Sequence, residues 1–148
     1  MSEVRITKIF SFEMAHALWN YDGMCSNIHG HSYVLFVTVT GEPEPDDNNP
    51  KFGMVIDFGD LKKIIDRTII NVFDHSFVIY KKAPLLKVKE IDKMLGNKII
   101  TDYQPTCENL LLDFKKRIEP ELPPDVKLFS LKLQETATSF AEWHADDN

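Results

Sequence analysis

Two long stretches, in which apolar side chains alternate with other residues, constrain the fold of this chain most. Residues 4–16 are apolar at all but one even position before ending at His16, and residues 29–40 repeat the alternation starting from His29 and His31. Successive side chains of a strand point to opposite faces, so each stretch predicts a long strand with one buried face. The three histidines share the parity of these buried faces.

The three imidazoles and a nearby thiol are candidates for a metal site. Gly30 leaves the opposite face of the second strand bare between His29 and His31, and Cys25 lies just upstream. Three imidazoles leave one tetrahedral position of a zinc ion open, which is typical of catalytic zinc. Two other interpretations stay open: His16 can be a hydrogen-bonded core residue, or Cys25 can close a structural site as a fourth ligand.

The middle of the chain favours helices. Apolar residues recur at helical spacing over residues 61–73, and Asp57 or Asp60 is suited to cap the start of this helix. Pro84–Leu95 predicts a shorter helix with proline in its first turn. An extended piece is expected at residues 99–103.

The last third predicts one more helix and two strands. Thr106 fits as the N-cap of a helix that stops at Pro120. After that helix, the odd positions place Phe129 and two leucines on one face of a strand, and Glu135 ends that face. A carboxylate buried there needs a donor partner, unless the strand has reached solvent. Ser139–His144 is expected to be the closing strand.

Composition places the chain among globular proteins and narrows its partners. The 148 residues, of which 43% are hydrophobic and 27% charged, predict a single α+β domain spanning residues 1–148. The net charge of -6 argues against general nucleic-acid binding. The chain starts without the apolar core of a signal peptide and has no apolar run long enough for a membrane span. With only two cysteines, a reducing cytoplasm is the expected location.

Six motifs in order resemble the family of 6-pyruvoyltetrahydropterin synthases and 6-carboxytetrahydropterin synthases. They are Phe12-Glu13-Met14-Ala15-His16, Cys25-x-x-x-His29-Gly30-His31, Val55-Ile56-Asp57-Phe58-x-x-Leu61-Lys62, Asp74-His75, Pro105-Thr106-x-Glu108-Asn109, and Glu135-Thr136 leading to Ala141-Glu142-Trp143. The resemblance implies the tunnelling fold, a four-stranded antiparallel sheet with helices packed on one face in ββααββ order. It also implies a homotrimer or homohexamer with sites at subunit interfaces.

The resemblance assigns a role to each residue of the expected site. It implies that zinc is bound by His16, His29 and His31. It implies a catalytic set of Cys25, Asp74 and His75, and pterin binding by Glu135, Thr106 and Glu108. For Glu108 a second interpretation stays open, since a carboxylate near a helix N-terminus can stabilise the helix alone.

The resemblance implies a lyase that acts on 7,8-dihydroneopterin triphosphate. One branch of the family stops at the 6-pyruvoyl product on the way to tetrahydrobiopterin. The other releases acetaldehyde and forms 6-carboxytetrahydropterin, a precursor of queuosine and other 7-deazapurines. The three-residue gap between Cys25 and His29 resembles the carboxy branch. The pyruvoyl reaction and a non-catalytic pterin-binding role are the alternatives.

Overall fold

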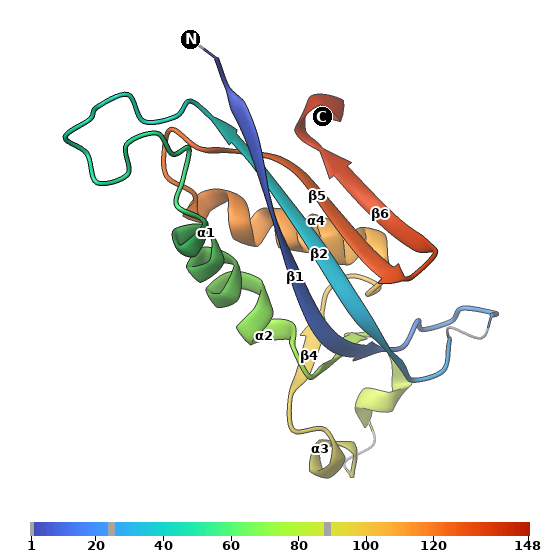
Figure 1. Cartoon of the computed structure of the whole chain (residues 1–148). Coiled ribbons are helices and arrows are strands. Elements are labelled where there is room, and N and C mark those ends of the chain that lie inside the picture. Colours follow the sequence, from blue (N-terminus) through green and yellow to red (C-terminus); the bar gives the residue numbers. More distant parts are fainter. Residues whose placement is uncertain (1, 24–25, 88–89) are drawn as a thin grey trace.

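The chain folds into one curved sheet with helices packed on one of its faces (Figure 1). The computed structural model describes residues 2–23, 26–87 and 90–148. The strands are β1 (Val4–His16), β2 (His29–Gly41), β3 (Ser76–Tyr80), β4 (Lys98–Thr101), β5 (Lys127–Thr136) and β6 (Ser139–His144). The helices are α1 (Phe58–Ile65), α2 (Asn71–Phe73), α3 (Ile91–Met94) and α4 (Cys107–Ile118), with a π-helical segment η2 (Asp66–Ile70) between α1 and α2. Short 3₁₀ turns are η3 (Pro84–Lys87), η4 (Glu119–Glu121) and η5 (Ala145–Asp147).

The two long strands pair as their alternation requires. β1 and β2 are antiparallel over their full lengths, so His16 at the end of β1 lies directly opposite His29 at the start of β2. The even residues of β1 and the odd residues of β2 face the core, where Phe12 and Leu35 pack against Leu61 and Phe114 from the helices. The fold therefore brings the three histidines together at one end of the sheet.

The four-stranded sheet expected from the resemblance is wrong in its strand number. The sheet has six strands in the order β4-β3-β1-β2-β5-β6, and β3 and β4 run parallel to β1 beyond its free edge. β3 is a short apolar run without alternation, because Phe77 and Ile79 pack on one side of it and Val78 on the other. Such runs do not reveal a strand by periodicity. The α+β class, the antiparallel pairing of β1, β2, β5 and β6, and helices on one face are confirmed.

The helices form where their caps predict. Asp57 accepts a hydrogen bond from the Gly59 backbone N–H at the start of α1, and Thr106 accepts one from the Asn109 N–H at the start of α4. The helix expected at Pro84–Leu95 is shorter than predicted, since only η3 and α3 form among its described residues. The described part of the chain contains no helix long and apolar enough to span a bilayer.

Two bulges in β5 change which side chains face the core. Pairing with β2 shifts between Thr38 and Val39, so Phe129 is an extra residue that leaves the core face, and Leu128 takes its place. The predicted inward position of Phe129 is therefore wrong; its ring lies under the Arg5 guanidinium instead, 3.8 Å away. The second shift, in the pairing with β6, leaves Glu135 as the extra residue. Bulges of this kind re-aim side chains beside functional sites.

Candidate metal and pterin site

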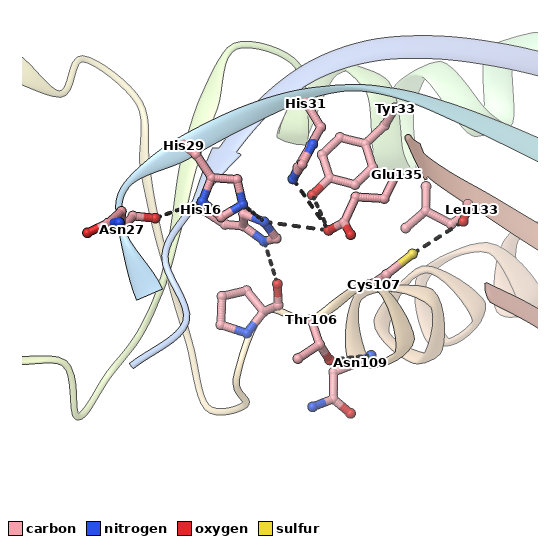
Figure 2. Close-up of polar contacts among 11 residues, drawn as sticks. His16, Asn27, His29, His31, Tyr33, Thr106, Cys107, Asn109, Leu133 and Glu135 are labelled. Atoms are coloured by element: carbon pink, nitrogen blue, oxygen red, sulfur yellow. Dashed lines mark hydrogen bonds and ion pairs between the residues drawn. The ribbon is translucent and has the colours of Figure 1, made fainter. Parts of the chain in front are cut away.

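Three imidazoles converge at the end of the sheet where β1 stops and β2 begins (Figure 2). One ring nitrogen of each of His16, His29 and His31 lies within 4.8 Å of the others. The Nε2 atoms of His16 and His29 are 2.9 Å apart. The structure thus brings the three predicted ligands together, and His16 is only 1% exposed.

Hydrogen bonds to backbone carbonyls decide which nitrogen the imidazoles of His16 and His29 offer. Nδ1 of His16 lies 2.7 Å from the Pro105 carbonyl oxygen, and Nδ1 of His29 lies 2.7 Å from the Asn27 carbonyl oxygen. A carbonyl oxygen only accepts, so each Nδ1 carries the hydrogen and each neutral ring presents its Nε2 lone pair. Two lone pairs only 2.9 Å apart repel unless a cation lies beside them. The arrangement is the one found around histidine ligands of metals.

Burial disfavours protonation of these imidazoles, so a proton is not suited to be the cation beside the two nitrogens. It lowers the pKa of His16 and His31 below the usual 6.5, and the neighbouring His29 lowers both further, against the opposing effect of Glu135. Nε2 of His31 is buried and has no hydrogen-bond partner among the described residues. An unpaired buried acceptor is costly unless something binds it. The donor set therefore fits a metal ion that prefers imidazole, as zinc does.

Glu135 faces the imidazoles from the neighbouring strand β5 (Figure 2). Its Oε1 lies 3.5 Å from Nε2 of His16 and 3.7 Å from Nε2 of His31. The hydroxyl of Tyr33 donates to the same oxygen at 3.4 Å. Glu135 thus has a donor partner inside the site, and its alternative position at a solvent-exposed strand end is wrong.

The N-terminus of α4 forms another wall of the site. The carbonyl of Pro105 holds His16, and Thr106 follows directly in the chain. The Thr106 hydroxyl caps α4 by accepting a hydrogen bond from the Asn109 N–H at 3.2 Å. Cys107 is buried, its thiol donates to the Leu133 carbonyl oxygen at 3.2 Å, and burial raises its pKa to about 12. Cys107 is therefore a packing residue. Glu108 is exposed in the first turn of α4.

Asp74 and His75 directly precede β3 and lie beside Glu13 of β1. The backbone of Glu13 makes a hydrogen bond to each of them. Its N–H donates to Asp74 Oδ1 at 2.9 Å, and its carbonyl accepts from the His75 N–H at 2.6 Å. His75 lines a hollow of about 430 Å³ together with Glu13, Ser32 and His31, a member of the imidazole cluster. Neither Asp74 nor His75 belongs to the group of three imidazoles whose ring nitrogens converge.

The geometry of the pair is nevertheless suited to proton transfer. Asp74 Oδ1 lies 3.0 Å from Nδ1 of His75, whose side chain is 78% exposed. The Glu13 N–H and His75 lower the pKa of Asp74. His75 has a left-handed backbone with φ of 58°, which is uncommon outside glycine and is concentrated at functional positions. The predicted thiol, Cys25, lies outside the described residues.

Sequence reasoning missed three contributors to this site. The Pro105 and Asn27 carbonyls set the imidazole orientation, and backbone groups leave no trace in side-chain patterns. The Tyr33 hydroxyl was treated as part of an apolar face. Its position two residues after His31 was the available signal, because it places the hydroxyl on the histidine face of the same strand.

Comparisons with known proteins agree with the fold. The family model described as 6-pyruvoyl tetrahydropterin synthase matches residues 5–146. A 6-carboxy-5,6,7,8-tetrahydropterin synthase of Haemophilus influenzae is 33% identical over 141 residues, covering 94% of this chain and 97% of that protein. A dihydroneopterin monophosphate aldolase of Pyrococcus furiosus is 35% identical over 137 residues, covering 90% of each. The structure of Caenorhabditis elegans 6-pyruvoyl tetrahydropterin synthase has a TM-score of 0.64 at 24% identity, covering 98% of this chain and 97% of that one.

These matches span nearly the whole chain, as the six motifs do. They confirm the resemblance that the motifs indicated, and they confirm the prediction of an enzyme similar to 6-carboxytetrahydropterin synthase, a lyase. Since the family model covers almost every residue, including all three histidines and Glu135, the chain belongs to the 6-pyruvoyl tetrahydropterin synthase family.

Proposed function

We propose that this enzyme converts 7,8-dihydroneopterin triphosphate to 6-carboxy-5,6,7,8-tetrahydropterin, with release of acetaldehyde and triphosphate. The observation that carries the proposal is the cluster of three imidazoles with Glu135 beside it at one end of the sheet. His16, His29 and His31 would hold zinc, which as a Lewis acid would polarise the side-chain oxygens of the substrate and acidify neighbouring protons.

Glu135 is proposed to anchor the pterin ring. A carboxylate can accept two parallel hydrogen bonds, which matches the amino group and ring N–H on the pyrimidine edge of a pterin. Its Oε1 lies within 3.7 Å of two imidazoles, so a ring bound there would bring its side chain toward the cluster. Thr106 and Glu108, on the first turn of α4, are proposed to line the same pocket.

Cys25, Asp74 and His75 are proposed as the acid/base set. Cys25 would remove a proton from a side-chain carbon as the thiolate, since the thiolate is the reactive form of cysteine. The Asp74 carboxylate fixes Nδ1 of His75 and leaves Nε2 pointing outward to carry a proton. The exposure of His75 supports a role toward a group outside its own subunit.

We propose that a second copy of the chain supplies Asp74 and His75 to each site. In one chain, Asp74 is held by the Glu13 backbone, and the group of three converging imidazoles includes neither Asp74 nor His75. The outer sheet face also carries exposed apolar side chains, including Ile9 at 57% and Phe140 at 54% exposure. Large exposed apolar residues on a sheet face favour association. A homotrimer or homohexamer built through the sheets would cover them.

The relatives support the carboxy product and suggest a second candidate. The Haemophilus relative is named a 6-carboxytetrahydropterin synthase, and the three-residue gap between Cys25 and His29 resembles that branch. Its product would feed the synthesis of queuosine and other 7-deazapurines. The Pyrococcus relative favours an aldolase that cleaves the side chain of dihydroneopterin monophosphate. The 6-pyruvoyl reaction and a purely pterin-binding role remain as the outcomes of the test.

Anaerobic incubation of the zinc-loaded protein with dihydroneopterin triphosphate tests the proposal. Carboxytetrahydropterin with an equal amount of acetaldehyde is the expected result. A pyruvoyl product without acetaldehyde would assign the chain to the biopterin branch. Turnover of the monophosphate alone, with a phosphorylated two-carbon aldehyde, would favour the aldolase. Absence of conversion despite bound zinc would indicate a binding protein.

A further inference from the structure

The Tyr33 hydroxyl lies between the imidazole cluster and Glu135 in the interior of the site (Figure 2). Tyr33 is fully buried on β2, on the same face as His29 and His31. Its hydroxyl donates to Glu135 Oε1 at 3.4 Å. A buried phenol keeps such a partner because its O–H is costly to leave unpaired.

The ring of Tyr33 is held independently of any ligand. It stacks on Phe12 at 5.2 Å with an interplanar angle of 9°. The imidazoles of His16 and His31 meet it edge-on at 6.3 Å and 5.6 Å between ring centroids. These contacts leave the ring few alternatives, so the hydroxyl is a fixed donor rather than a mobile one.

Glu135 needs such a donor more than an ordinary strand residue does. It is the extra residue of a bulge, so the regular ladder with β6 does not constrain its backbone. Its Oε1 also lies within 3.7 Å of the metal-facing nitrogens of His16 and His31. A carboxylate drawn toward a metal ion held by those nitrogens would present the wrong edge to a pterin. A carboxylate has about four lone-pair positions, so Oε1 can accept from Tyr33 and still accept from a ligand.

From these contacts we infer that Tyr33 is a positioning residue for pterin recognition and acts through the carboxylate of Glu135. The inference rests on the proposed role of Glu135 as the pterin anchor. The hydroxyl orients the carboxylate edge, which lies beside the imidazoles of His16 and His31. Tyr33 thereby links the metal-binding and pterin-binding parts of the site without touching the reacting atoms.

The test is a double-mutant cycle of Tyr33→Phe and Glu135→Ala, which removes the hydroxyl and its acceptor singly and together. Binding of pterin-6-carboxylate to the zinc-loaded protein is measured by fluorescence, and zinc content by elemental analysis. Tyr33→Phe is expected to weaken pterin binding about tenfold, as loss of a hydrogen bond to a charged group does, with zinc content unchanged. In the Glu135→Ala background, the same change should alter the affinity less than about twofold.

Tyr103→Phe is the matched control. The Tyr103 hydroxyl also donates to a carboxylate, Asp113 Oδ2 at 2.5 Å, but this acceptor lies on α4 and is not Glu135. Tyr103→Phe should lower the unfolding temperature of the protein and leave its pterin affinity unchanged. Equal weakening by Tyr33→Phe in both backgrounds, or no weakening at all, would overturn the inference. If Glu135→Ala itself left pterin binding intact, the proposed anchoring role would fail instead.

Discussion

The metal-free protein is expected to lose stability when the pH falls from 7.5 to 5.5. Burial lowers the pKa of His16 and His31 in the folded chain, while the same imidazoles titrate near 6.5 when unfolded. Below pH 6.5 the unfolded chain therefore binds more protons than the folded one. The free energy of unfolding falls with pH in that window, and the stability contributed by the neutral imidazoles is fully present only above it.

The size of the loss follows from the number of protons. One extra proton bound by the unfolded state changes the free energy of unfolding by about 1.4 kcal/mol per pH unit. Two histidines that stay neutral in the folded state would cost together about 3 kcal/mol at pH 5.5. The attraction of Glu135 for a charged imidazole opposes part of this shift, so about 1 to 3 kcal/mol is expected.

Urea unfolding of chelator-treated protein measures this loss. Titrations at pH 7.5, 6.5 and 5.5 are run at one protein concentration, because an oligomer's apparent stability depends on it. The double variant with His16→Gln and His31→Gln keeps the other three of the chain's five histidines and serves as the comparison. Its stability should change by less than about 1 kcal/mol over the same range. Equal losses in both proteins, or none in the parent, would refute the reasoning from burial.

Further predictions concern the metal, the thiol, the shared site and the helix cap. His29→Ala should lower zinc affinity more than about a hundredfold in a chelator competition, whereas Cys25→Ala should keep zinc and lose most turnover. Prompt alkylation of Cys25 with zinc retained would exclude a closed structural site. Mixed oligomers of His75→Ala and His29→Ala chains should regain activity that neither parent has, and absence of recovery would place both groups in one subunit's site. Thr106→Ala should cost about 1 kcal/mol of unfolding free energy, and Thr106→Ser should restore most of it.

The metal cluster was accessible from the sequence because its signal is local. Strand alternation puts His29 and His31 on one face whatever the rest of the fold does, and the same parity puts His16 among apolar residues. The caps of α1 and α4 were also predictable, since an N-cap side chain bonds to a backbone N–H only two or three residues ahead.

The errors have equally local causes. Phe129 was predicted to face the core because the alternation of the later residues was extended back past the bulge. A bulge adds one residue to the strand, so the residues before it face the opposite side from the one that the alternation predicts. The strand β3 was missed because both of its faces are buried, which removes the alternation. Its pairing beside β1 is parallel and is set by contacts distant in the sequence.

The sequence by itself determined which side chains could form the site, because residue type and strand parity are properties of short segments. It indicated three imidazoles on buried faces and a carboxylate at the end of a third strand. Only the tertiary structure decided how these groups meet. The pairing of β1 with β2 sets His16 opposite His29, a bulge positions Glu135, and the Pro105 carbonyl, distant in the sequence, orients the His16 ring. The structure also placed Asp74 and His75 beside Glu13 of β1 and outside the group of three imidazoles, because β3, which follows them, pairs in parallel with the end of β1.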